Sequence, residues 1–81
     1  MEVSIVVVGR VDLDEQLVIE TAKGRITDVD ELDVEFARKG DCGGNYVECT
    51  VKGRKRGFGA HRNYQTALLA AIREFKTQPS R

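Results

Sequence analysis

Apolar residues near the start of the chain follow two different spacings. Residues 3–9 are rich in β-branched side chains, and so short an apolar run favours a buried strand over a helix. Residues 13–23 place apolar side chains at helical spacing, after a capping-box-like start at Asp12 and before Gly24, a typical residue beyond a helix end. We predict a helix there. A strand over 17–21 that turns at Gly24 stays open as the alternative.

The middle of the chain carries a hairpin pattern. Residues 27–33 are acidic and aperiodic, so we expect a connection rather than an element. Apolar and polar side chains then alternate over 34–37 and again over 47–52, on either side of a glycine-rich stretch at 41–45. This pattern predicts two antiparallel strands joined by a tight turn.

The register of this hairpin follows from where the turn is centred. If it is centred on residues 43–44, Phe36 lies opposite Val51, and Glu35 lies opposite Lys52. Apolar side chains then meet on one face of the pair and opposite charges meet on the other, which stabilises cross-strand pairs.

The last third of the chain contains the strongest element. A turn over 53–57 leads to a short strand around 56–60. Asn63 is a good N-cap for a helix after it, and Pro79 stops any continuation. Apolar residues recur every three or four positions in this helix, and they are Tyr64, Ala67, Leu68, Ala71, Ile72 and Phe75.

Together these elements predict an α+β fold. We expect a two-layer sandwich in which an antiparallel sheet carries helices on one face, with the order β-α-β-β-β-α. The chain of 81 residues has room for a single core. We therefore expect one domain over 1–78 and a C-terminal tail over 79–81.

Composition excludes several classes of protein. With 41% hydrophobic and 32% charged residues, one Pro and eight Gly, the chain is typical of a soluble globular domain. The longest apolar run, residues 5–8, is far shorter than the roughly 20 residues that span a bilayer, so we expect no membrane partner. The first residues lack the pattern of a signal peptide, which indicates a cytoplasmic location.

The sequence offers little catalytic chemistry. Cys42, Cys49 and His61 match no zinc-site spacing, and no fourth ligand is evident. A Cys42–Cys49 disulfide is disfavoured by the hairpin register, which places Cys42 in the turn and Cys49 opposite Arg38. Cys49 reads as a small core residue and Cys42 as an exposed thiol. No nucleophile motif occurs either, so we expect no catalytic residues, no metal, no cofactor and no enzymatic activity.

The formal charge of zero hides a strong segregation. Residues 1–48 hold twelve acids and five bases, whereas residues 49–81 hold eight bases and one acid. A chain divided in this way can bind a polyanion with its basic half, or it can pair its two halves within or between copies.

Most of the basic excess is concentrated in residues 52–62. This segment runs from a hairpin turn to a helix N-terminus, where free N–H groups and the helix dipole favour an anion. Its glycines would let a phosphate approach the backbone, and a purely structural role for them stays open as the alternative. The alternative is a solvated turn whose cations protect an edge strand from aggregation. The candidate nucleic-acid-binding residues are Lys52, Arg54, Lys55, Arg56, Gly57, Gly59, His61 and Arg62.

The same segment carries a family resemblance. Gly53, Gly57 and Gly59, after a strand over 46–52 and before an alanine-rich helix, resemble the second half of a double-stranded-RNA-binding domain. The resemblance covers residues 12–77 in the order α-β-β-β-α and leaves the first strand as an addition. It implies recognition of duplex RNA by its shape, phosphates and 2′-hydroxyls.

A second, weaker resemblance concerns residues 34–75. Ala67 and Ala71, in a helix that follows a G-x-G strand, resemble one β-β-β-α repeat of the regulatory dimer domain of isopropylmalate synthases and their citramalate relatives. In that family two such units pack together and bind an amino-acid effector between them. The resemblance implies self-association or a protein partner.

Two hypotheses follow. The first is a non-catalytic module that binds nucleic-acid phosphates, preferably of duplex RNA, through the basic turn and helix start. The second is a self-associating regulatory or protein–protein interaction module, which includes the possibility of a homodimer.

Overall fold

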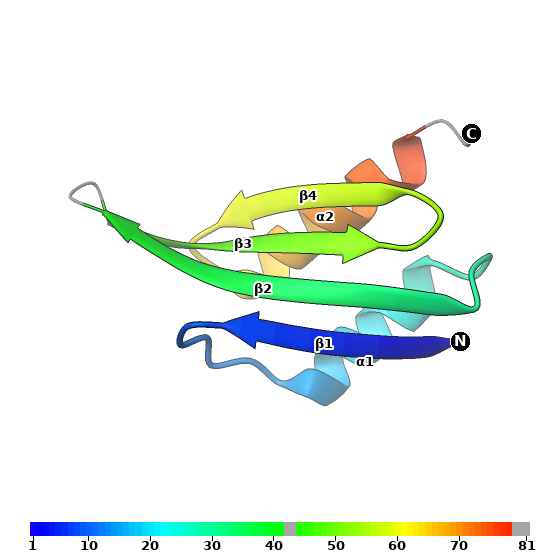
Figure 1. Ribbon diagram of the computed structural model, residues 1–81, viewed down its shortest axis with the longest axis horizontal. Coiled ribbons are helices and arrows are strands. Elements are labelled where there is room, and N and C mark those ends of the chain that lie inside the picture. Colours follow the sequence, from blue (N-terminus) through cyan, green and yellow to red (C-terminus); the bar gives the residue numbers. More distant parts are fainter. Residues whose placement is uncertain (42–43, 79–81) are drawn as a thin grey trace.

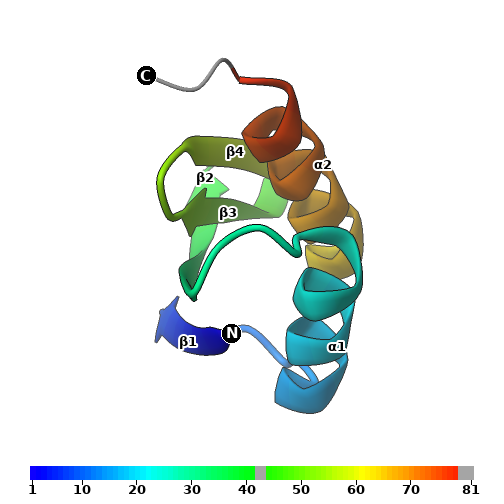
Figure 2. The same cartoon turned by 90° about the vertical axis from the view of Figure 1, so that its right-hand side faces the viewer.

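The computed structural model describes residues 1–41 and 44–78, with only the backbone of Asp41, and it confirms the α+β class (Figure 1). Two helices lie on one face of a four-stranded sheet, and the other face of the sheet is open (Figure 2). The elements are β1 (Glu2–Val8), α1 (Glu15–Arg25), β2 (Glu31–Asp41), β3 (Gly44–Lys52), β4 (Arg56–His61) and α2 (Tyr64–Thr77).

The sheet is mixed, with the strand order β1-β2-β3-β4. β2, β3 and β4 form the antiparallel meander, but β1 runs parallel to β2, so the prediction of a wholly antiparallel sheet was wrong. The reason is the helical crossover. α1 carries the chain back to the end of the sheet where β1 began, and β2 therefore starts in the same direction as β1.

The hairpin register differs from the predicted one by two residues. Val34 lies opposite Val51 and Phe36 lies opposite Cys49, because the ladder continues as far as Asp41 and Gly44. Gly44 closes the ladder with a φ of 128°, which a residue with a side chain rarely adopts. Shifting by two residues preserves the inward and outward faces, so the predicted core-facing residues of both strands stay correct.

The structure decides between the helix and the strand that the sequence left open for residues 17–21. Residues 17–21 are helical, and the helix begins two residues later than predicted, with Asp14 as its N-cap. The Asp14 carboxylate accepts a hydrogen bond from the backbone N–H of Leu17 at 3.2 Å. Gly24 lies inside the last turn rather than beyond it. The connection expected over 27–33 is shorter than predicted, because β2 already begins at Glu31.

α2 follows the prediction closely. Asn63 is its N-cap, and its side chain accepts a hydrogen bond from the N–H of Gln65 at 2.8 Å. The predicted apolar stripe faces the sheet, where the Tyr64 ring meets Phe36 edge-on at a centroid distance of 5.9 Å. The core lies between sheet and helices and contains Val18, Ala22, Ile26, Leu32, Val34, Phe36, Val47, Cys49, Val51, Ala67, Leu68, Ala71, Ile72 and Phe75.

Three sequence predictions concern residues that the structure does not describe. They are the exposed thiol of Cys42, the absence of a Cys42–Cys49 disulfide and the tail over 79–81. Among the described helices, neither is long and apolar enough to cross a membrane.

Candidate functional site

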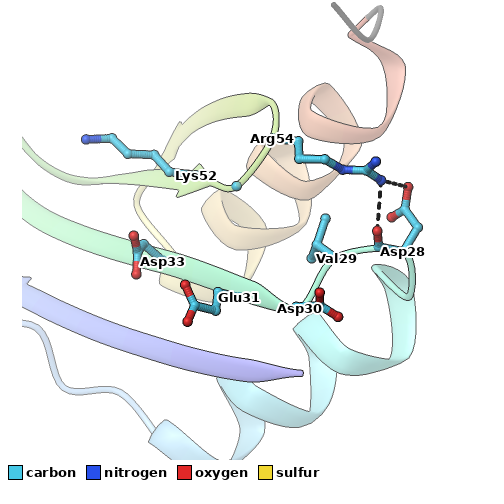
Figure 3. Close-up of a pocket in the computed structure, with 8 residues that line it drawn as sticks. Asp28, Val29, Asp30, Glu31, Asp33, Lys52 and Arg54 are labelled. Atoms are coloured by element: carbon cyan, nitrogen blue, oxygen red, sulfur yellow. Dashed lines mark hydrogen bonds and ion pairs between the residues drawn. The ribbon is translucent and has the colours of Figure 1, made fainter.

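The predicted basic segment does not form one surface. Arg54 points away from the sheet toward the connection after α1, where its Nη2 donates to the backbone carbonyl of Asp28 at 2.8 Å (Figure 3). The same nitrogen forms an ion pair with an Asp28 carboxylate oxygen at 3.1 Å. Lys52 and Arg56 lie opposite each other on the open face of the sheet. Arg54 is therefore held in an ion pair within the chain, whereas Lys52 and Arg56 lie on the open face of the sheet.

His61 and Arg62 lie at the other end of β4. That strand spans about 17 Å between Arg56 and His61 at about 3.3 Å per residue. The Nδ1 atom of His61 accepts a hydrogen bond from the N–H of Asn63 at 3.1 Å, so this ring supports the start of α2. The two ends of the segment are thus separated by the length of a strand.

Gly57 and Gly59 have a packing role, contrary to the prediction that a phosphate approaches them. Both are buried where α2 crosses β4. A Cβ atom on Gly57 would lie 2.6 Å from the backbone nitrogen of Phe75, and one on Gly59 would lie 2.7 Å from that of Ala71. The glycines let the helix backbone reach the strand, which leaves no path for a ligand from that side.

The fold gathers a different set of cations at one end of the helical layer. We call Arg25, Lys55, Arg73 and Lys76 the basic belt. Two neighbouring hollows of about 350 and 270 Å³ are both lined by Arg25 and Lys76. Arg73 lines the first hollow and Lys55 lines the second. Three elements therefore contribute to the belt: the end of α1, the β3–β4 turn and the last half of α2.

The charge of the belt exceeds what local structure requires. Arg25 and Lys76 lie in the last turns of their helices, where a cation offsets about half a negative charge from the helix dipole. Two such helix ends account for about one unit of positive charge out of four. Among the residues described as lining the two hollows, Asp28 is the single acid, and it pairs with Arg54. No belt cation is in an ion pair with a described residue.

The belt is only partly visible in the sequence. Lys55 belonged to the predicted set, but Arg25, Arg73 and Lys76 did not. Arg73 and Lys76 are three residues apart in α2, which places them on one side of that helix, away from the apolar stripe. Nothing in the sequence shows that the end of α1 comes to lie beside them.

An acidic hollow lies on the other side of the Arg54–Asp28 pair (Figure 3). It has a volume of about 630 Å³ and is lined by Asp28, Val29, Asp30, Glu31, Asp33, Lys52, Gly53 and Arg54. In residues 1–41 and 44–78, no group of three or more His, Cys, Asp or Glu side chains is placed to hold a metal ion. The hollow is wide and open, so its carboxylates remain in water. It adds an acidic surface next to the basic belt.

Cys49 is a core residue, as predicted. Its side chain is fully buried, and burial raises the pKa of its thiol from 9.0 to about 12. The thiol therefore stays protonated at neutral pH. A protonated, inaccessible thiol is not a nucleophile.

In comparisons with known proteins, no family model matches this chain, and no curated protein sequence matches it. The structure places a belt of four cations from three elements beside two neighbouring hollows.

Proposed function

We propose that the protein is a non-catalytic module that binds the phosphate backbone of a nucleic acid, and that the basic belt is its contact surface. The observation that carries this proposal is the gathering of Arg25, Lys55, Arg73 and Lys76 around two adjoining hollows without a carboxylate partner among the described residues. Arg and Lys side chains that lie side by side favour a ligand with several regularly spaced negative charges.

Duplex RNA is the form we propose as the preferred ligand. From α1 to α2 the elements run α-β-β-β-α with both helices on one face, which is the order implied by the resemblance to double-stranded-RNA-binding domains. Modules of that kind recognise the shape and the backbone of the duplex and need little contact with bases. The belt offers cations, and the aromatic residue that lines its second hollow, Phe75, is only 2% exposed and cannot stack on a base, which suits such recognition.

The belt is also the better of the available surfaces. α1 carries the exposed side chains of Glu15 and Glu20, which would repel a phosphate backbone. The predicted contact segment, residues 52–62, is divided between the two ends of β4 and the open sheet face. At the belt end of the helices, by contrast, four cations line the two hollows against a single described carboxylate, that of Asp28.

Paired neutralising variants test the proposal. Arg73→Gln with Lys76→Gln removes two charges from the belt, and Arg56→Gln with Arg62→Gln removes two from the predicted segment outside it. We expect the wild-type affinity for a 20-base-pair RNA to fall steeply with salt, by roughly 0.9 log units per log unit of salt for each phosphate contact. The belt variant should lower the affinity at least about tenfold and reduce the slope by about two. The other variant should change the affinity less than about threefold.

Fluorescence anisotropy over a series of salt concentrations gives both quantities, and circular dichroism verifies that each variant is folded. Equal losses in the two variants would mean that the belt is not the contact surface. A salt-independent affinity, or no binding at low salt, would contradict the proposed function itself. Tighter binding to single strands than to the duplex would contradict the preference for duplex RNA.

A further inference from the structure

The two edges of the sheet are treated differently. β4 is covered by α2, and the Glu74 carboxylate of that helix accepts a hydrogen bond from the backbone N–H of Phe58 at 3.2 Å. β1 has no such cover. The side chain of Val7 faces the helical layer and is nevertheless 40% exposed, although natural edge strands are usually short, charged or covered.

The backbone of β1 presents its unpaired groups in a regular pattern. The N–H of Glu2 donates to the carbonyl of Asp30 at 2.9 Å, so the even-numbered residues of β1 direct their backbone groups toward β2. Successive residues of a strand point in opposite directions along the sheet. Val3, Ile5 and Val7 therefore direct their N–H and C=O groups to the free edge.

We propose that this edge pairs antiparallel with β1 of a second copy, about a two-fold axis at Ile5. In this register Ile5 lies opposite Ile5, and Val3 lies opposite Val7 of the other copy. Each such pair exchanges two hydrogen bonds, which gives about six bonds and satisfies every edge-directed group of the three residues. A shift by two residues in either direction leaves two such pairs among these residues, with about four hydrogen bonds, so this register is the most favourable.

The side chains are also compatible with this register. On the open face, Ser4 of one copy meets Val6 of the other, and no like charges are opposed. Glu2 lies opposite Val8, close to the point where Arg10 of the other copy follows the strand, and the two carry opposite charges. The pair of strands is therefore self-complementary in hydrogen bonding and charge.

α1 provides room for the added strand. The first turns of this helix extend past the edge of β1, on the helical side of the sheet (Figure 2). Only Val18 and Ala22 of α1 are buried, and Val7 faces the helical side while remaining 40% exposed. A second β1 would continue the sheet over this projecting part of α1 and cover Val7. The proposed pairing does not use any residue of the basic belt, so it is independent of nucleic-acid binding.

Val7→Pro tests the hydrogen bonds of the free edge. The N–H of Val7 points away from β2, so proline removes an edge bond and leaves the β1–β2 ladder intact. Val7→Thr, which keeps both the N–H and the branched side chain, is the matched control. In analytical ultracentrifugation we expect the wild type and Val7→Thr to dimerise, and Val7→Pro to raise the dimer dissociation constant at least about tenfold.

Cysteine cross-linking tests the register. In a Cys42→Ser background, Ser4→Cys and Val6→Cys proteins should form a disulfide-linked dimer when mixed, because these positions face each other at about 4.5 Å between Cα atoms. Ser4→Cys alone should cross-link much more slowly, since its two copies are two residues out of register, beyond the reach of an unstrained disulfide.

Each result supports or overturns the inference. A monomer at every concentration overturns it, and so does a dimer that Val7→Pro leaves unchanged. A dimer that dissociates in high salt would identify pairing between the acidic hollow and the basic belt, which also overturns pairing at β1. Equal cross-linking of Ser4→Cys alone would show a different register.

Discussion

The two edge strands of the sheet, β4 and β1, differ in how closely a helix approaches them. On the β4 side, α2 packs at backbone distance, because Gly57 and Gly59 have no side chains to hold it away. On the β1 side, only two residues of α1 itself are buried, Val18 and Ala22. The edge of β1 is left exposed. Close packing is thus concentrated in the half formed by β3, β4 and α2, whereas β1 keeps exposed apolar side chains at Val6, Val7 and Val8.

The largest expected effect comes from a methyl group placed between β4 and α2. Gly57→Ala would bring a Cβ atom within 2.6 Å of the Phe75 nitrogen, so the helix must move away from the strand. We expect a loss of about 3 kcal/mol or more in the free energy of unfolding.

Gly24→Ala is the matched change on the α1 side. Nothing lies within 4 Å of the added Cβ, and alanine favours the helix, so we expect a gain of about 0.5–1 kcal/mol. Urea unfolding of both variants measures the difference. Similar values for the two substitutions would show that the β4–α2 half is not the more closely packed one.

A smaller effect is expected from the thiol beneath α2. The pKa of Cys49 is raised from 9.0 to about 12 in the folded protein, so the folded state holds this proton more tightly than the unfolded state. Its contribution to stability is complete below pH 9 and is lost as the pH rises toward 12. At pH 10 we expect the wild type to have lost about 1.4 kcal/mol relative to Cys49→Ala, each compared with its own value at pH 7.

Chemical unfolding at the two pH values measures this loss. Reaction of Cys49 with a thiol reagent gives a second readout, because a buried thiol reacts only when the α2 half opens. Rapid labelling of the native protein at pH 8, in a Cys42→Ser background, would contradict the tight packing of that half.

The smallest effect concerns the contact between the two halves. Arg54, in the β3–β4 turn, forms an ion pair with Asp28, in the connection after α1. Both side chains are mostly exposed, so water and salt screen the pair. A double-mutant cycle with Arg54→Gln and Asp28→Asn should give a coupling energy below about 1 kcal/mol that decreases with salt. A coupling above about 2 kcal/mol would show that this pair holds the halves together.

Much of the fold was predictable because it depends on local periodicity. α2 was recognised from residues spaced by three and four, and its cap from Asn63. The faces of β2 and β3 followed from alternation. The register was wrong by two residues, since alternation has a period of two and cannot distinguish registers that differ by that amount.

The site was much less predictable. A run of cations in the sequence suggested one surface, but a β-strand directs neighbouring side chains to opposite faces, and an ion pair withdraws Arg54. Glycines that resembled a phosphate-binding loop are packing positions beneath α2. The belt went unrecognised because Arg25 is about thirty residues from Lys55 and about fifty from Arg73 and Lys76.

The amino-acid sequence alone determined the class of fold, the residues of the core faces and the segregation of charge, because each depends on the spacing of residue types over a few positions. Only the tertiary structure decided that β1 runs parallel to β2, that β1 is left as an uncovered edge and that four distant cations meet. These features depend on where α1 crosses the sheet and how close α2 can come to β4. Both are set by packing between segments that are far apart in the chain.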